Sequence, residues 1–143
     1  MYTPPSNAIV LVLARLFISA IFLMSGFGKI FDFSGTAGYM ESHGMPIASF
    51  FLLGAIVFEL AGGLSVLLGY KANWGAVLLI VFLIPTTLIF HGFWRVEEEA
   101  QRMETIQFMK NLAILGGLFF VYSFGSGSMS LDRHLSKKQQ RPF

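Results

Sequence analysis

Four ionisable side chains lie inside long apolar stretches of the sequence: Arg15, Glu59, His91 and Lys110. A charge near the centre of a bilayer costs about 2.5–3.5 kcal/mol on insertion scales, so such residues generally face the interior of a helix bundle and find partners there. A cation or a histidine can hydrogen-bond a carbonyl or an anion, and a carboxylate can relay a proton. These four residues are therefore the first candidates for any chemistry.

Four apolar stretches of about 20 residues must position these side chains. They cover residues 8–28, 50–70, 73–94 and 106–124, and each is long enough to cross a bilayer as a helix. The 143-residue chain is 55% hydrophobic and 13% charged, whereas a soluble domain is about 25% charged. We predict an all-α integral membrane protein, a single domain over residues 1–143 built as a four-helix transmembrane bundle.

The composition also argues against a soluble enzyme, a DNA-binding module and a disordered chain. Cysteine is absent, which excludes disulfides, thiolate catalysis and Cys-ligated metal centres within this chain. His43, His91 and His134 lie in different environments, so they do not suggest a pair of haem ligands. We expect no metal site and no intrinsic cofactor, and the isolated chain is not expected to be an enzyme.

The connecting segments differ in length and composition. Residues 29–49 form the longest one, and the pattern from Ser34 to the stop signals Gly44 and Pro46 predicts a short interfacial helix between the first and second spans. Residues 71–72 predict a tight turn. Residues 95–105 are strongly polar without Gly or Pro, which predicts a helix that extends into water. Residues 125–143 begin Gly-Ser-Gly-Ser and become basic, which predicts a flexible tail.

The distribution of lysine and arginine predicts the orientation in the membrane. An even number of spans places both termini on one side, which carries Lys71 and the basic residues of the tail. The other side carries Lys29 and Arg95 together with most of the acidic residues. Cytoplasmic loops are enriched in Lys and Arg. We therefore predict that both termini are cytoplasmic.

Helical spacing predicts a polar seam between the spans. In the first span, one face carries Arg15, Ser19, Phe22, Gly26 and Lys29. In the second span, Glu59 shares its face with Gly62 and Gly63. Because glycines let another helix approach closely, this face is expected to lie inside the bundle.

Depth along the helices suggests partners for the buried acid. Glu59 falls near the middle of its span. At a rise of about 1.5 Å per residue, Arg15 lies roughly 5 Å to one side of its own midpoint and Lys110 roughly 7–8 Å to the other. We expect Glu59 to face the bundle interior and to pair with Arg15 or Lys110. Lys110 is preferred because His91 lies at a similar depth.

The candidate ligand-binding or polar cluster comprises Arg15, Lys29, Glu59, His91, Lys110 and Asn111. Several of these residues have a plainer interpretation. Lys29 and Lys110 could extend to the lipid headgroups, and Arg15 could do so less easily. His91 could be an interfacial residue beside the aromatic residues that follow it. Glu59 cannot reach the lipid headgroups from the middle of its span. It therefore either forms a structural pair with another side chain or has a functional role.

The order and spacing of several motifs resemble the DoxX family of small bacterial inner-membrane proteins. The motifs are Leu13-Ala14-Arg15, Gly26-Phe27-Gly28-Lys29, residues 33–46, Glu59-Leu60-Ala61-Gly62-Gly63, Gly69, His91-Gly92-Phe93-Trp94, Phe108-Met109-Lys110-Asn111-Leu112 and Ser130-Leu131-Asp132. The resemblance covers about residues 8–133. It implies a four-helix protein of the bacterial inner membrane. One branch of the family is linked to a thiosulfate:quinone oxidoreductase and another to a mycobacterial complex with oxidative-stress enzymes, while many members have no established activity.

Three functions remain open on the sequence alone. The first is a non-catalytic membrane subunit or scaffold associated with redox or stress-response complexes, with a membrane or periplasmic redox protein as partner. The second is a quinone-binding subunit of a membrane oxidoreductase. The third is a small proton or anion transporter, for which four helices would require a homo-oligomer. We expect no nucleic-acid partner, because basic residues beside a bilayer more naturally meet acidic lipid.

Overall fold

The computed structural model describes residues 5–139, and within this range the chain is helical without strands. The elements in chain order are α1 (Pro5–Phe31), α2 (Phe33–Ser42), α3 (Ala48–Leu68), α4 (Ala72–Phe90), the 3-10 turn η1 (Phe93–Arg95), α5 (Glu98–Phe124) and α6 (Leu131–Gln139). Four of these helices, α1, α3, α4 and α5, are long and apolar enough to cross a membrane. The predicted all-α, four-span architecture is confirmed, including the short helix between the first two spans.

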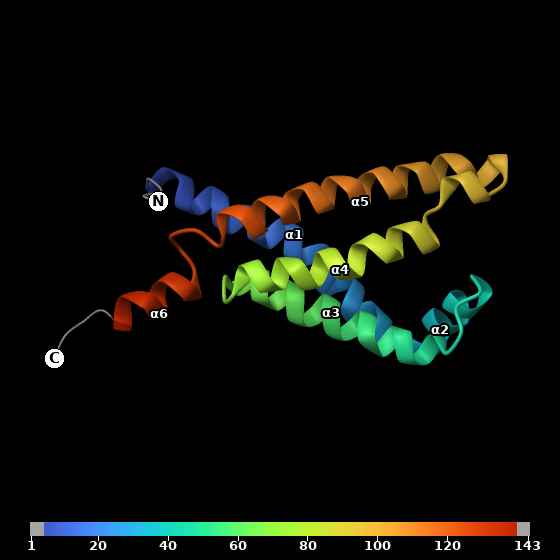
Figure 1. Cartoon of the computed structure of the whole chain (residues 1–143), viewed down its shortest axis with the longest axis horizontal. Helices are drawn as coiled ribbons and strands as arrows, with labels where there is room; N and C mark the ends of the chain where they lie inside the picture. Colours follow the sequence, from blue (N-terminus) through green and yellow to red (C-terminus); the bar gives the residue numbers. More distant parts are fainter. Residues whose placement is uncertain (1–4, 140–143) are drawn as a thin grey trace.

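The two ends of the molecule have different structures (Figure 1). The start of α1, the turn between α3 and α4, and α6 lie at one end, whereas α2 and the connection from α4 to α5 lie at the other. Below, these are called the α6 end and the α2 end. Residues 125–139 fold back at the α6 end, where the Asp132 amide donates to Gly69 O at 3.0 Å and the Lys71 amide donates to Asp132 Oδ1 at 3.0 Å. The tail for which the sequence predicts flexibility therefore contains a helix tied to the α3–α4 turn.

The four long helices pack in sequence order. α1 packs along α3, α3 along α4, and α4 along α5, whereas α1 and α5 meet over a much shorter stretch. Apolar side chains from all four helices form one core, which contains Phe22, Val66, Ala76, Leu79, Leu83, Leu115 and Leu118. A second cluster of Ala37, Met40, Ala48, Leu52 and Ile56 fixes α2 against α3.

Glycines explain how closely α3 and α4 approach. A Cβ atom on Gly62 would lie 2.7 Å from Leu79 Cγ and 3.0 Å from the carbonyl oxygen of Gly75. A Cβ atom on Gly75 would overlap the Ser65 side chain. Small residues let helix backbones approach within a membrane, where van der Waals packing drives association. The Gly62 face, together with the buried Glu59, lies inside the bundle as the sequence predicts.

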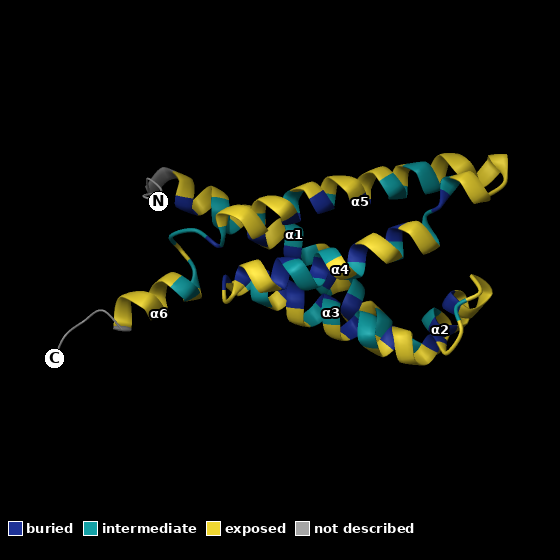
Figure 2. Cartoon of the chain, viewed as in Figure 1, coloured by how far each residue is buried: buried dark blue, intermediate teal, exposed yellow. Residues whose placement is uncertain are grey.

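The outer surface of the bundle is largely apolar along the membrane-length helices. Large side chains such as Phe17, Phe50, Trp74 and Phe120 are between 68% and 71% exposed. Figure 2 shows exposed residues along the outward sides of the long helices and buried residues where the helices meet. So much exposed apolar surface is unfavourable in water but fits a lipid environment. The protein is a membrane protein that sits in a lipid bilayer.

Three element boundaries differ from the sequence predictions. α5 begins at Glu98, so the polar extension and the fourth span form one helix. α4 ends at Phe90, so His91 lies just beyond the helix as its C-cap, although the apolar span that could cross a membrane continues to Arg95. α2 begins at Phe33 rather than at Ser34, because the Asp32 side chain caps it by accepting from the Gly35 amide at 3.2 Å.

Candidate functional site

Lys29 and Glu59 form an ion pair between α1 and α3. Lys29 Nζ lies 2.9 Å from Glu59 Oε2 and 3.1 Å from Oε1, and it also donates to Ser25 Oγ at 2.5 Å. Glu59 is only 2% exposed, as expected from its mid-span position. The prediction that Arg15 or Lys110 pairs with Glu59 is wrong, because Lys29 takes that place.

Close packing of α1 on α3 brings the pair together. A Cβ atom on Gly26 would lie 2.8 Å from Leu60 Cδ2 and 3.4 Å from Glu59 Cβ. Lys29 follows Gly26 by three residues, so it lies on the same face of α1 and can reach across to α3. α1 continues to Phe31, so Lys29 lies in the last turn of the helix and not beyond its end.

Arg15 lies at the α6 end of the molecule. It precedes Lys29 by 14 residues of the same helix, which corresponds to about 20 Å. Its Nη2 donates to the carbonyl oxygen of Met129 at 2.5 Å. Arg15 is therefore buried as the sequence predicts, but it belongs to a different part of the structure from the other candidate residues.

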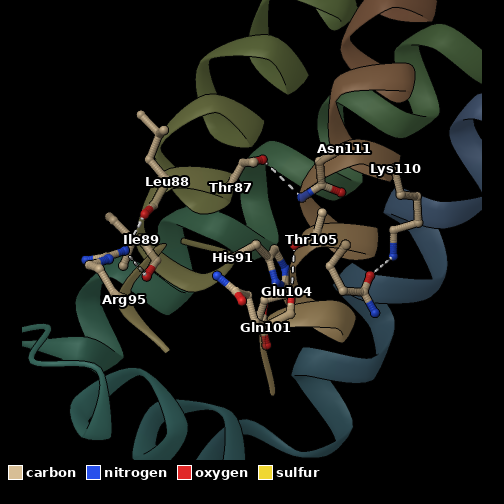
Figure 3. Close-up of polar contacts among 11 residues, drawn as sticks. Thr87, Leu88, Ile89, His91, Arg95, Gln101, Glu104, Thr105, Lys110 and Asn111 are labelled. Atoms are coloured by element: carbon tan, nitrogen blue, oxygen red, sulfur yellow. Dashed lines mark hydrogen bonds and ion pairs between the residues drawn. The ribbon is translucent and has the colours of Figure 1, made fainter. Parts of the chain in front are cut away.

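Asn111 and Thr87 connect α5 to α4 within the bundle (Figure 3). Asn111 Nδ2 donates to Thr87 Oγ1 at 3.0 Å, and Thr87 Oγ1 donates to the carbonyl oxygen of Leu83 at 2.7 Å. Both side chains are buried, so the bond satisfies polar groups that water cannot reach. The Lys110 side chain instead points along its own helix and donates to Gln107 Oε1.

His91 contacts an acid that the sequence analysis did not single out. Its Nδ1 donates to Glu104 Oε2 at 2.8 Å, which links the end of α4 to the first turns of α5 (Figure 3). The neighbouring Arg95 donates to the carbonyl oxygens of Leu88 at 2.5 Å and Ile89 at 3.0 Å. These carbonyls belong to the last turn of α4, where helices leave acceptors unsatisfied. The sequence feature that could have identified Glu104 is the predicted helical extension over residues 95–105. This extension places Glu104 beside the end of α4.

Five of the six candidate residues line one cleft of about 1390 Å³ at the α2 end: Lys29, Glu59, His91, Lys110 and Asn111. Helices α1 to α5 all contribute to its walls, and most of the remaining lining is apolar. We call this cavity the central cleft. A large apolar cavity with a few convergent polar groups is the usual form of a site for small molecules.

An aromatic group on α2 and α4 forms part of the same wall. The Tyr39 and His43 ring centroids are 4.3 Å apart, and the Tyr39 and Phe90 centroids are 5.7 Å apart. Burial of the Tyr39 phenol raises its pKa above the usual value near 10, and the negative charge of Glu104 raises this pKa further. Tyr39 therefore keeps its hydroxyl proton at neutral pH and lines the central cleft, a place that its sequence position in a short surface helix did not suggest.

Four membrane-length helices that enclose a largely apolar cleft with a few polar groups define a small multi-span membrane protein. The chain belongs to the DoxX family, whose model matches residues 10–92. It is 35% identical over 127 residues to the inner membrane protein YqjF of Escherichia coli (strain K12), covering 89% of this chain and 92% of that protein. It is 34% identical over 128 residues to the inner membrane protein YphA of the same strain, covering 90% of this chain and 91% of that protein.

The chain is also similar, more distantly, to a eukaryotic protein. The chain is 26% identical over 145 residues to the Surfeit locus protein 4 homolog of Drosophila melanogaster, covering 92% of this chain but 53% of that protein. No solved structure matches the chain significantly. The matched residues 10–92 include Arg15, Lys29, Glu59 and His91, whereas Lys110 and Asn111 lie beyond the family model.

Proposed function

We propose that this chain is a non-catalytic membrane subunit that binds a quinone in the central cleft for a membrane or periplasmic redox partner. The observation that carries the proposal is the combination of a partly buried Lys29–Glu59 pair with a largely apolar cavity of about 1390 Å³. A quinone has a ring with two carbonyl oxygens and an apolar tail, so it needs hydrogen-bond donors at one end and an apolar wall along the rest.

The residues present fit these requirements. Lys29 is 21% exposed at its side chain, so its ammonium group can donate to a carbonyl oxygen while Glu59 balances its charge. The Tyr39 hydroxyl and the Asn111 amide line the same cleft as further polar groups. Phenylalanine side chains, including Phe50, Phe51 and Phe58, supply apolar surface for a tail. A bound quinone would supply two-electron redox chemistry, and the electrons would come from the partner protein.

The same contacts also favour a second candidate, a scaffold without a small ligand. The Asn111–Thr87 bond and the Lys29–Glu59 pair each join two neighbouring helices. Buried polar contacts of this kind can fix the register of packed helices. In that case the polar residues would serve the fold alone, and partner proteins would bind elsewhere on the surface.

A titration distinguishes the two functions. The full chain in lipid nanodiscs is titrated with decylubiquinone, and binding is followed by isothermal calorimetry. Quinone binding predicts a saturable isotherm that Lys29→Gln weakens by about tenfold, corresponding to one lost charge-assisted hydrogen bond. Lys71→Gln is the matched control because Lys71 lies at the α6 end, outside the cleft. A flat isotherm with a folded wild-type chain would overturn quinone binding and leave the scaffold.

We also propose that the protein resides in the bacterial inner membrane with both termini in the cytoplasm. The relatives YqjF and YphA carry inner membrane protein in their names. The α6 end carries Lys71, Arg133, Lys137 and Lys138, whereas the loops at the α2 end carry Asp32, Glu41 and residues 97–99. The enrichment of cytoplasmic loops in lysine and arginine supports this orientation.

A further inference from the structure

A second cavity, of about 450 Å³, lies at the α6 end of the molecule. We call it the basic pocket. Its walls come from Arg15 on α1, Leu68 at the end of α3, the segment 128–131, and the side chains of Arg133 and Lys137 on α6. Arg15 is the one candidate residue that the central cleft does not include, so the quinone proposal leaves it without a role.

The lining of the basic pocket carries positive charge without a compensating acid. Arg15, Arg133 and Lys137 are the cations, His134 adds a titratable ring, and none of the lining residues is Asp or Glu. The nearest acid in sequence, Asp132, uses its Oδ1 to accept from the Lys71 amide and does not line the pocket. Such an arrangement favours an anionic ligand.

Arg15 itself has unused hydrogen-bonding capacity. It is 5% exposed, and its single hydrogen bond within residues 5–139 runs from Nη2 to Met129 O. Its Nε and Nη1 are buried and have no hydrogen-bond partner in the described part of the chain. A buried charged group with unmet donors is costly, and an anion beside it relieves that cost. Arginine is also suited to phosphate, because its planar donors match the geometry of phosphate oxygens.

The surroundings of the pocket indicate that the anion is part of a lipid. Met129, Leu131 and Leu135 are 57%, 41% and 45% exposed on the segment that carries the cations. Leu131 and Leu135 lie beside Arg133 and Lys137 in the nine-residue helix α6, and Met129 lies two residues before this helix, next to the ends of the membrane spans. A free phosphate ion would leave this apolar surface uncovered, whereas the acyl chains of a lipid would cover it.

We propose that the basic pocket binds the phosphate group of an anionic phospholipid. Arg15, Arg133 and Lys137 hold the headgroup, and the exposed apolar residues of segment 129–135 contact its acyl chains. The bound lipid fixes α6 against the ends of α1 and α3. This site is separate from the central cleft, so its occupancy does not depend on quinone binding.

Native mass spectrometry of the full chain in neutral detergent tests the proposal. The protein is offered dioleoyl-phosphatidylglycerol or dioleoyl-phosphatidylcholine, and the fraction that retains one lipid is measured. We expect retention of one phosphatidylglycerol and not of phosphatidylcholine. Arg133→Gln with Lys137→Gln should weaken retention by about tenfold or more, since each basic residue near a lipid surface contributes about 1 kcal/mol. Both substitutions are on exposed positions, so the bundle should remain folded.

A double variant with the same charge change serves as the control. Lys71→Gln with Lys138→Gln removes two positive charges from the same end of the molecule, but neither residue lines the pocket. An equal loss of phosphatidylglycerol in this control would mean diffuse attraction and would overturn the site. Retention of phosphatidylcholine equal to that of phosphatidylglycerol would overturn it as well. If inorganic phosphate at constant ionic strength displaces the lipid at equal concentration, the pocket is a site for free phosphate and the lipid assignment is wrong.

Discussion

Lys29 at the end of α1 holds Glu59 in the middle of α3, with 2.9 Å between Nζ and Oε2. We expect Lys29→Met to destabilise the protein by about 3–5 kcal/mol by analogy with soluble proteins, because the buried Glu59 carboxyl would lose the cation that compensates its charge. Lys110→Met is the matched control, since Lys110 contacts Gln107 on its own helix. Chemical unfolding in mixed micelles, followed by circular dichroism, measures the difference. Equal unfolding midpoints for the two variants would contradict this role of the pair.

The bond from Asn111 to Thr87 offers a second test of helix packing. Thr87→Val removes a hydroxyl that serves both α5 and its own helix, whereas Thr86→Val removes one that donates only to Phe82 within α4. We expect Thr87→Val to cost about 0.6 kcal/mol more than Thr86→Val, up to about 1.7 kcal/mol, the range for hydrogen bonds between membrane helices. The same unfolding assay applies. A larger loss for Thr86→Val would show that the bond between the helices does not stabilise the bundle.

Gly69 should be intolerant of substitution. Its φ of 66° is in the left-handed region, and a Cβ atom there would overlap Arg15 Nη1 and lie 2.6 Å from Ser130 Cβ. Gly69→Ala should therefore cost more than about 1 kcal/mol. Gly116→Ala is the control, because a Cβ atom on Gly116 would meet nothing within 4 Å. Thermal unfolding should separate the two variants, and a Gly69→Ala protein as stable as wild type would mean that the α6 end repacks freely.

The proposed orientation can be tested directly because the sequence contains no cysteine. Ser136→Cys places a single thiol on α6, and Glu99→Cys places one in the first turn of α5 at the α2 end. In intact spheroplasts, a membrane-impermeant maleimide should label Glu99→Cys, whereas Ser136→Cys should react only after the membrane is opened. The reverse pattern would place the termini outside the cytoplasm.

The helical periodicity of the sequence predicted which face of α1 lies inside the bundle, whereas the estimated depth of residues along the spans did not predict the ion pair. The face that carries Arg15, Ser19, Phe22 and Lys29 follows from helical geometry alone, and the structure turns that face inward. Depth along isolated spans failed to identify the partner of Glu59. That calculation treats each helix as centred on its apolar stretch, whereas the closeness of α1 and α3 depends on packing at Gly26.

Contacts between distant segments could not be predicted from the sequence either. Glu104 meets His91 because α5 starts at Glu98 and runs beside the end of α4. The helix in the tail was missed because the Gly-Ser residues at 125–128 indicate flexibility, whereas Asp132 fixes the following residues to the α3–α4 turn. Neither pairing has a local signal, since each depends on how separate helices pack.

The bond between Arg15 and Met129 joins residues 114 positions apart in the chain. During synthesis, α1 enters the membrane long before the segment that contains Met129 has been made. Until then, the guanidinium group of Arg15 lacks the carbonyl that it contacts in the finished protein, and a charge without a partner in a membrane helix is costly. The contacts at the α6 end can therefore form only after α5 is inserted. A chain truncated before residue 129 would keep all four spans but would lack the acceptor for its first buried cation.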